Sequence, residues 1–432
     1  PNRPVFPTPD MLDKMQGFVQ PFPDAGVPPE KVLNELDSFG SPGTVSSAGG
    51  RYFGFVIGGS LPAALAANML AGAWDQNAGI EASSPVSACL EQVCRGWLTT
   101  ALKLPAQAET GFTTGATMAN FTGLAAARHA LLAERGWDVE KRGLFGAPEI
   151  QVIVGNEVHV SALKALALLG LGNERVIRVP VDDQGRMIAS KIPVIRKPAI
   201  ICVQAGNVNT GAFDPADEIC DIARSNGAWV HVDGAFGLWA AACPTRQALV
   251  KGFEKADSWS TDAHKWLNVP YDSGLAFVRE PRHLVGAMST SASYLGEGEA
   301  RDPHRFVPEI SRRARAVEIW AALRSLGRSG LAGLIDRNCR QAQRIASALQ
   351  AEGVKILNDV VLNQVLASFG DNDRTQRVIS VVQKDGVCWC GGTNWQGKSA
   401  MRISVSSWAT TDDDIDRATD AFIRAAKTAS KA

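Results

Sequence analysis

The chain has 432 residues, and its 44 basic and 44 acidic side chains cancel to a formal net charge of zero at pH 7. We expect no nucleic-acid or anionic-membrane partner, because a neutral chain exerts no long-range attraction on either. No apolar run reaches the roughly 18 residues that a membrane span requires, and no charged and apolar leader opens the chain. A cytoplasmic setting is therefore expected.

Residues 1–60 are expected to form an arm. Proline and glycine are frequent in the first part of this segment, and the pattern predicts one short helix, Pro29–Phe39. Irregular arms of this kind usually wrap a partner subunit, so we predict that this segment contacts a second copy of the chain.

Strands and helices alternate from Leu61 to about Phe306. Such alternation predicts an α/β fold in which a mostly parallel sheet is covered on both faces, and it places a large domain at residues 61–308. The expected strands are Gln151–Val154, Val176–Val179, Ala199–Val203, Ala228–Val232, Ser258–Thr261 and Gly274–Val278.

A small α+β domain, residues 309–432, is expected to follow. Two helical stretches open it, Ser311–Gly327 and Leu331–Glu352, and the second ends at a glycine as helices commonly do. The remaining expected elements are the strands Gln364–Ser368, Arg377–Gln383 and Met401–Val405 and a last helix that begins near Thr410.

The eight cysteines are scattered and include no C-x-x-C pair, and the sequence has no H-E-x-x-H motif. These spacings disfavour a metal site, and we expect reduced thiols. Cys388 and Cys390 would point to the same face of a strand, where they could bind a soft metal or pack as two thiols. Packing is the more common outcome.

Lys265 and Asp233 suggest a cofactor. Lys265 lies in Ser260–Trp266 after one expected strand, and Asp233 ends another, Trp229–Asp233. Pyridoxal phosphate requires an amine that holds it as a Schiff base and an anion that keeps its ring nitrogen protonated, so that the ring can accept electrons. Alone, these residues could instead be a solvated amine and a capping carboxylate.

Two further features fit the same cofactor. Gly115, Ala116 and Thr117 open an apolar helical stretch, and the N–H groups at a helix start bind phosphate. No lysine follows the glycine, so this turn is not a Walker loop. His159 follows a short strand, at the sheet edge where ligands bind, and its flat ring could stack on a pyridine. Plain helix capping and a backbone hydrogen bond are the alternatives.

The sequence resembles the group II pyridoxal phosphate-dependent amino-acid decarboxylases, which have the fold-type I architecture and include aromatic amino-acid, histidine and glutamate decarboxylases. The resemblance extends from the first third of the chain to its tail, with matching order and spacing. The segments that carry it are Arg51–Phe55, Gly115–Thr117, His159, His231–Ala235, His264–Trp266, Ser311–Arg313 and Met401–Ser404.

The resemblance implies a role for each matched residue. Lys265 would hold the cofactor and later move protons, while Asp233 would bind the ring nitrogen. His159 and Ala235 would pack on the two faces of the ring. The other matched positions would bind the phosphate, through Gly115, Ala116, Thr117 and His264, or lie near the phenolic oxygen, where Asn207 stands in place of the family's Gly-Thr pair.

The family's catalytic loop differs here. Its aromatic amino-acid members carry a tyrosine there that protonates the carbanion, whereas Glu299–Pro308 contains none. His304 is the nearest candidate acid, with a suitable titration range, or else a solvated loop histidine. Phe53 and Phe55 resemble the segment that lines the substrate mouth, where they would favour an aromatic or apolar substrate, or they are core residues.

We therefore expect a homodimeric lyase that decarboxylates an L-amino acid at a site between two subunits. An aldehyde synthase or a carbon–carbon lyase of the same family is the alternative, because one cofactor serves all three reactions. A homologue that binds pyridoxal phosphate without turnover is the alternative of another class.

Overall fold

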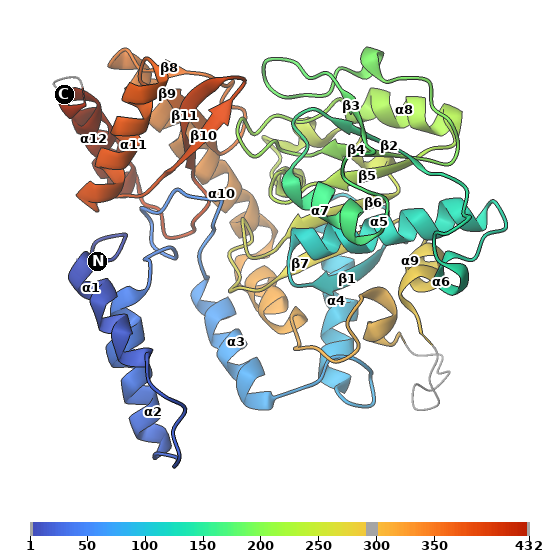
Figure 1. The fold of residues 1–432 in the computed structure, drawn as a ribbon, viewed down its shortest axis with the longest axis horizontal. Helices are drawn as coiled ribbons and strands as arrows, with labels where there is room; N and C mark the ends of the chain where they lie inside the picture. The colour runs from blue at the N-terminus through green and yellow to red at the C-terminus, as the bar shows by residue number, and fades with distance from the viewer. Residues whose placement is uncertain (1–2, 291–300, 430–432) are drawn as a thin grey trace.

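The computed structural model describes residues 3–290 and 301–429, and a seven-stranded sheet forms its centre (Figure 1). The strand order is β1-β7-β6-β5-β4-β2-β3, and β7 alone runs antiparallel to its neighbours within this described sheet. The strands are β1 (Glu109–Thr113), β2 (Gln151–Gly155), β3 (Ile177–Val179), β4 (Ala199–Gln204), β5 (Trp229–Asp233), β6 (Ser258–Asp262) and β7 (Gly274–Val278).

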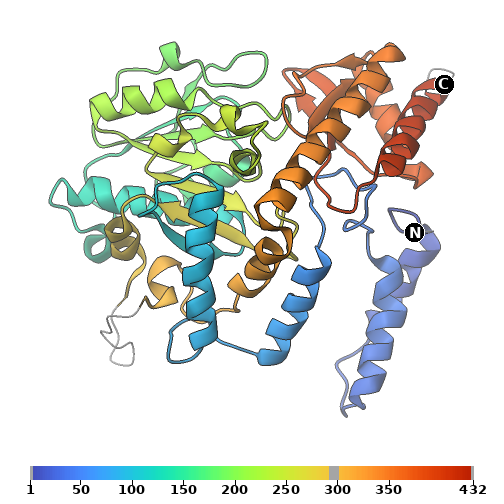
Figure 2. The ribbon, with the colours of Figure 1, turned by 180° about the vertical axis from the view of Figure 1, so that it is seen from behind.

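Helices cover both faces of this sheet because its strands are apolar on both sides. In β4, Ile200 and Cys202 pack into one cluster, whereas Ile201 and Val203 pack into the other. Figure 1 shows α5 and α7 in front of the sheet, and Figure 2 shows α4 on the opposite face. The covering helices are α4 (Pro85–Ala101), α5 (Ala116–Ala133), α6 (Val139–Arg142), α7 (Val160–Leu168), α8 (Ala216–Asn226) and α9 (Pro281–Met288). None of the described helices is both long and apolar enough to cross a membrane.

The C-terminal α+β domain has its own antiparallel sheet, in the order β10-β11-β9-β8. Its core is separate from the clusters around the large sheet. Its elements are β8 (Lys355–Ile356), β9 (Gln364–Ser368), β10 (Gly391–Trp395), β11 (Lys398–Ser404), α11 (Asn372–Asp385) and α12 (Asp412–Thr428), together with the end of α10 (Ala316–Ala351). Gly327 interrupts α10 with a left-handed φ of 60°, at the position where the sequence predicts the first helical stretch to end.

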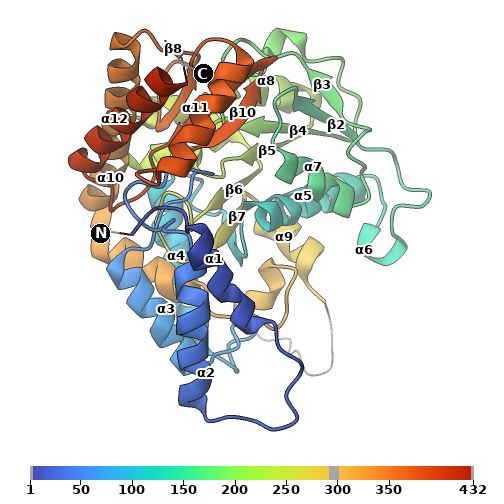
Figure 3. The same ribbon diagram turned by 60° about the vertical axis from the view of Figure 1, so that its left-hand side comes forward.

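The N-terminal segment lies beside the rest of the chain (Figures 1 and 3). Its end joins the C-terminal domain, since the Phe53 N–H donates to the Trp389 carbonyl at 2.8 Å and the Phe53 ring packs on Phe422. Its helices are α1 (Pro9–Asp13), η1 (Lys14–Phe18), α2 (Pro29–Glu35), η2 (Leu36–Gly40) and η3 (Ser41–Gly43), and α3 (Pro62–Trp74) follows it. The other short helices are η4 (Ala189–Lys191), η5 (Gly237–Ala242), η6 (Gln247–Val250), η7 (Phe253–Lys255) and η8 (Pro303–Phe306).

The predicted central strands are confirmed within one or two residues, but β1, β8 and β10 were not expected, and one predicted strand of the small domain is helical. β1, with the sequence ETGFT, lacks an apolar run and was not expected; pairing with β7 buries it. The strand predicted at Arg377–Gln383 is wrong, because this stretch lies inside α11. Its buried residues Thr375, Val378, Ile379 and Val382 follow helical spacing, and the Asp371 side chain caps the helix.

Replacing Asp371 by alanine should lower the free energy of unfolding by about 1 kcal/mol, because its carboxylate accepts the Arg374 N–H at 2.7 Å at the start of α11. Urea denaturation measures this difference. Asp373→Ala is the matched control: Asp373 lies in the same first turn without being the N-cap residue, and its loss should be smaller. Equal losses for the two variants would contradict the capping role.

Candidate active site

The predicted site residues lie at one edge of the large sheet, where strands β1, β2, β5 and β6 end. β2, β4, β5 and β6 are mutually parallel, and β1 runs in the same direction across β7. His159, Asp233 and Lys265 all follow or end such strands, and the helix that begins at Ala116 follows β1. The carboxyl edge of a parallel sheet is where α/β proteins bind ligands, so the arrangement defines a candidate active site.

Asp233 ends β5 and is buried, with 5% of its surface exposed. Its Oδ2 accepts a hydrogen bond from Asn120 Nδ2 at 3.2 Å and lies 3.5 Å from the Ser161 hydroxyl. Its Oδ1 accepts the Ala235 N–H at 3.3 Å. These donors stabilise negative charge on the buried carboxylate, as a partner of a protonated ring nitrogen requires.

Lys265 lies three residues beyond β6, and its ammonium is 2.9 Å from Asp262 Oδ2. The other oxygen of the same carboxylate accepts the Ala116 N–H at 2.6 Å. Asp262 therefore joins the lysine to the first turn of α5. The Ala116 N–H thus donates to a carboxylate, which is compatible with the phosphate-binding role predicted for Gly115, Ala116 and Thr117.

His264 lies against the same turn. Its Nδ1 accepts the Ser273 N–H at 3.1 Å, and its Nε2 is 3.3 Å from Asp262 Oδ1, so the proton of the neutral ring is on Nε2. Burial is the main cause that lowers the pKa of His264. Tyr271 stacks on this ring with centroids 4.2 Å apart. His264 thus offers a neutral N–H donor at the predicted phosphate site.

His159 caps the start of α7 and is held as a neutral ring. Its Nδ1 accepts the Ser161 N–H at 3.2 Å and is 2.7 Å from the Ser161 hydroxyl. Burial lowers the pKa of His159 most, with Lys265 acting in the same direction and Asp233 against it. A neutral imidazole tied by one nitrogen keeps a flat face available for stacking. The backbone bond and the stacking role are therefore compatible.

The described contacts of two predicted residues, Asn207 and His304, lie outside this group. Asn207 closes its own turn, because its Oδ1 accepts the N–H groups of Asn209 at 2.9 Å and Thr210 at 3.3 Å. His304 is buried in η8, which packs on β1 and α9, and its N–H donates to the Gly79 carbonyl at 2.8 Å. The solvated-loop alternative for His304 is thereby wrong.

Phe53 requires a correction. It was expected to line the substrate mouth, but it is 1% exposed and belongs to the core of the C-terminal domain, where its ring lies 6.5 Å from that of Phe422. Phe55, two residues on, is 57% exposed. The Phe53 side chain is buried and the Phe55 side chain is exposed, so the role predicted at the substrate mouth is kept for Phe55 alone.

The structure adds Asn120, Ser161 and Asp262 to the site. Each stood in or beside a motif that the sequence had marked, but none had been given a role. Asn120 carried a usable signal: it is a polar residue four positions after Ala116, on the same face of a helix otherwise rich in alanine and leucine. Asp262 precedes the lysine by three residues at the end of β6.

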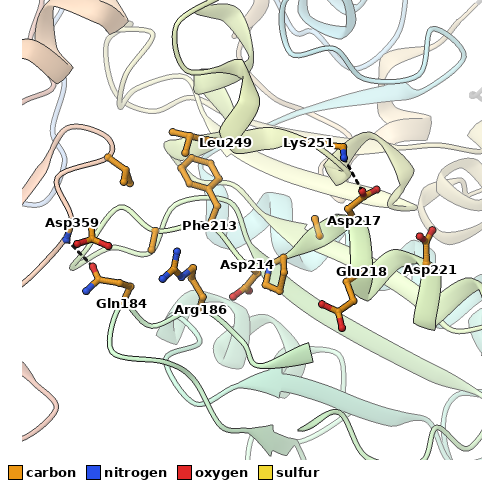
Figure 4. Close-up of a pocket in the computed structure, with 14 residues that line it drawn as sticks. Gln184, Arg186, Phe213, Asp214, Asp217, Glu218, Asp221, Leu249, Lys251 and Asp359 are labelled. Atoms are coloured by element: carbon orange, nitrogen blue, oxygen red, sulfur yellow. Dashed lines mark hydrogen bonds and ion pairs between the residues drawn. The ribbon is translucent and has the colours of Figure 1, made fainter. Parts of the chain in front are cut away.

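A separate hollow of about 550 Å³ lies beside Asp214 (Figure 4). Its lining includes Gln184, Phe213, Asp217 and Lys251, and none of the site residues described above. Burial raises the pKa of Asp214 to about 6, but both its oxygens accept backbone N–H groups, from Met187 at 2.6 Å and Gln204 at 2.7 Å. Asp214 therefore joins the end of β4 to the segment at Met187.

The fold and the site define a pyridoxal phosphate enzyme, because one sheet edge carries an amine, a buried carboxylate and an anion-binding helix start. The comparisons agree. Residues 13–368 match the family model described as the pyridoxal-dependent decarboxylase conserved domain, and the chain belongs to this family. Pyridoxal 5'-phosphate is its cofactor, and Lys265, Asp233 and the first turn of α5 are the described groups that fit it.

Curated relatives cover most of the chain. An aromatic-L-amino-acid decarboxylase of Bacillus atrophaeus is 25% identical over 443 aligned positions, with 95% of this chain and 88% of the relative covered. An L-2,4-diaminobutyrate decarboxylase of Rhizobium meliloti is 29% identical, with 83% and 74% covered. The crystal structure of Oryza sativa TDC with PLP and tryptamine superposes with a TM-score of 0.89 at 22% identity, covering 99% and 93% of the two chains, and confirms the fold.

His231, two residues before Asp233 in β5, makes a pH-dependent contribution to stability. Burial lowers its pKa from 6.5 to about 4, with Asp233 acting in the opposite direction. Below pH 6.5 the unfolded chain takes up a proton at this histidine, whereas the native chain does so only near pH 4. The native state therefore loses stability as the pH falls through this window.

His231→Gln should remove this dependence. Between about pH 6.5 and 4 the unfolding free energy of the variant should fall less steeply than that of the wild type, by up to about 1.4 kcal/mol per pH unit. Urea denaturation of both proteins across the window measures the difference, in which the other titrating groups cancel. Parallel curves for the two proteins would contradict a buried neutral His231.

Proposed function

We propose that the chain decarboxylates an L-amino acid with an aromatic or apolar side chain. The observation that carries the proposal is the convergence of Lys265, Asp262 and Ala116 on one sheet edge with the buried Asp233. The names of the relatives support an amino-acid substrate, since they include aromatic-L-amino-acid and tryptophan decarboxylases. The diaminobutyrate decarboxylase among them shows that family membership leaves the side chain open.

The cofactor supplies an electron-accepting ring for the charge that remains when carbon dioxide departs. Asp233 would keep the ring nitrogen protonated, because its carboxylate is buried and fully ordered by hydrogen bonds. His159 would lie on one ring face and Ala235 on the other. Lys265 Nζ would anchor the cofactor and return the proton to the substrate, with Asp262 holding the ammonium at 2.9 Å between these events.

An aromatic cluster supports the choice of side chain. Trp389 stacks on Tyr52 with centroids 5.0 Å apart and lies 5.3 Å from Phe55. Phe55 and Val56 have left-handed φ angles of 54° and 59°, which non-glycine residues adopt at a cost and which often occur near functional sites. Gly58, two residues after Val56, lies so close to the Lys265 carbonyl that a Cβ at this position would overlap it. The cluster is thus tied to the lysine loop.

An aldehyde synthase is the second candidate. Residues 301–308 contain no tyrosine, and a relative 27% identical to the chain is the phenylacetaldehyde synthase of Petunia hybrida. The His304 backbone N–H donates to the Gly79 carbonyl, and no described hydrogen bond joins the His304 side chain to the lysine group, so we assign proton return to Lys265 and not to His304. If that proton transfer failed, molecular oxygen would oxidise the carbanion instead, and aldehyde, ammonia and hydrogen peroxide would be released in place of the amine.

Product analysis separates these reactions. Purified holoenzyme is incubated with each common L-amino acid, and carbon dioxide, amine, ammonia and aldehyde are quantified by mass spectrometry. We expect amine and carbon dioxide from aromatic or apolar substrates. Aldehyde with carbon dioxide and ammonia would favour the synthase, and aldehyde with glycine but no carbon dioxide would favour an aldol-type carbon–carbon lyase. A yellow protein whose cofactor borohydride fixes to Lys265, but which releases none of these products, would be a homologue without turnover.

Asp233→Ala should retain the cofactor but lower kcat by at least roughly a hundredfold, the scale of losing one preorganised charge partner. Cofactor retention is measured by absorbance after gel filtration, and kcat by carbon dioxide release. Asp217→Ala, an exposed carboxylate paired with Lys255, is the control and should leave kcat unchanged. A variant at Asp233 that keeps wild-type turnover would remove this residue from the mechanism.

We further propose that the chain is a homodimer whose N-terminal arm, residues 1–60, covers the partner, with the large domain at 61–308 and the small domain at 309–432. The arm and α3 carry exposed apolar side chains whose burial would require a partner surface. The most exposed are Val19, Phe22, Leu33 and Met69, at 78%, 96%, 65% and 66%.

Sedimentation should therefore show a dimer for the wild type and a monomer for the double variant Leu33→Glu, Met69→Glu, because each charge would be buried in the interface. Phe145→Glu is the matched control: Phe145 is 98% exposed but lies outside the arm and α3. A wild-type monomer that still turns over substrate would contradict the dimer.

A further inference from the structure

A continuous chain of hydrogen bonds leads from Asp233 into the interior of the sheet. Asn120 Nδ2 lies 3.2 Å from Asp233 Oδ2, and Asn120 Oδ1 lies 2.9 Å from His231 Nε2. His231 Nδ1 lies 2.8 Å from Ser258 Oγ, and Trp229 Nε1 donates to the same oxygen at 2.8 Å. The chain thus connects five side chains on β5, β6 and α5.

Each bond in this chain has only one possible direction. The Asp233 carboxylate can only accept, so Asn120 presents its N–H₂ group to Asp233 and its carbonyl oxygen to His231 Nε2. His231 Nε2 must therefore donate to that oxygen, and Nδ1 of the neutral imidazole accepts the proton of the Ser258 hydroxyl. Ser258 in turn accepts the indole N–H of Trp229, which can only donate.

Two further contacts hold Asn120 in this orientation. Ser260 Oγ donates to Asn120 Oδ1 at 2.5 Å, and Asn120 Nδ2 also lies 3.3 Å from Ser161 Oγ. Asn120, His231, Ser258 and Ser260 are all fully buried, so water does not compete for these bonds. An Asn120 amide turned by 180° would face the Asp233 carboxylate with its oxygen and the His231 N–H with its N–H₂ group, and would lose both of these bonds.

The packing of α5 brings Asn120 to this position. Gly123, one turn later on the same face of the helix, lies against His231, and a Cβ there would come within 2.8 Å of His231 Cε1. Ala116, one turn earlier, presents the N–H that binds the Asp262 carboxylate. One helix face therefore supplies the anion-binding turn, the donor to Asp233 and the close contact with β5.

We infer that Asn120 is a positioning residue that orients the Asp233 carboxylate toward the ring nitrogen of the cofactor and keeps that nitrogen protonated. This inference rests on the proposed role of Asp233. Asn120 acts by donating to Oδ2, which fixes the plane of the carboxylate and stabilises its negative charge, while His231 and Ser260 hold the amide from behind. The network fixes the orientation of the Asp233 carboxylate but brings no charge to it, because every side chain between Trp229 and Asp233 is neutral.

The test uses holoenzyme reconstituted with pyridoxal phosphate carrying ¹⁵N in the ring, because the ¹⁵N chemical shift reports whether that nitrogen is protonated. Asn120→Leu keeps the volume of the side chain and removes its polar atoms. We expect the ring signal to move toward the unprotonated position and kcat to fall roughly ten- to a hundredfold, the scale of one hydrogen bond to a charged group. The Kd of the cofactor should change less than kcat.

Thr122→Val is the matched control, because Thr122 is equally buried in α5 and its hydroxyl bonds only to Met118 of its own helix. It should leave the ¹⁵N shift and kcat unchanged. Ser260→Ala is the second variant in case Asn120→Leu does not fold, and it should move the ¹⁵N shift in the same direction with a smaller loss of kcat. A wild-type ¹⁵N shift in a folded Asn120→Leu, or in Ser260→Ala when that variant decides, would overturn the inference.

Asp233→Ala in the same experiment distinguishes a failure of the inference about Asn120 from a failure of the role proposed for Asp233. If this variant loses the protonated ring signal while Asn120→Leu keeps it, the inference about Asn120 fails and the role of Asp233 stands. If Asp233→Ala keeps both the protonated signal and turnover, the proposed function fails first, and the role of Asn120 fails with it.

Discussion

A carboxylate buried in a protein interior is costly unless donors surround it, and the site depends on how this chain meets that requirement at Asp233. The residue stands at the end of the central strand β5, where burial follows from the sheet covered on both faces. An amide, a backbone N–H and a nearby hydroxyl from α5, the loop after β5 and α7 converge on its two oxygens. These hydrogen-bond donors offset the cost of burying the carboxylate, and they also fix its orientation.

Helix α5 links the two ends of the site. Its first turn binds the Asp262 carboxylate, and through it the lysine, while its second turn reaches Asp233 through Asn120. Close approach of this helix to β5 is possible because Gly123 has no side chain to meet His231. A shift of the helix along its axis would therefore disturb the anion-binding turn and the carboxylate together.

The loop after Lys265 is where distant parts of the chain meet. Gly58 of the N-terminal segment contacts the Lys265 carbonyl, and Asn268 accepts the Trp408 N–H at 2.8 Å from the C-terminal domain. The Asn268 amide also donates to the Ser406 carbonyl at 3.0 Å. The position of the lysine is thus set jointly by the large sheet, the N-terminal segment and the small domain.

The sequence alone determined the class of fold, most strands of the large sheet, and the residues whose chemistry matches the cofactor: Lys265, Asp233, His159 and the turn at Gly115. The strands follow from local patterns, because apolar runs specify strands, whereas the site residues were predicted from their chemistry together with the family resemblance. Tertiary structure decided the rest. Arg377–Gln383 became helical because its apolar residues meet a core only at helical spacing, and Phe53 entered that core. The role proposed for Asn120 required the packing of α5 on β5: a polar residue on an apolar helix face indicates a buried contact, but local sequence does not say which residues, more than a hundred positions away, it meets.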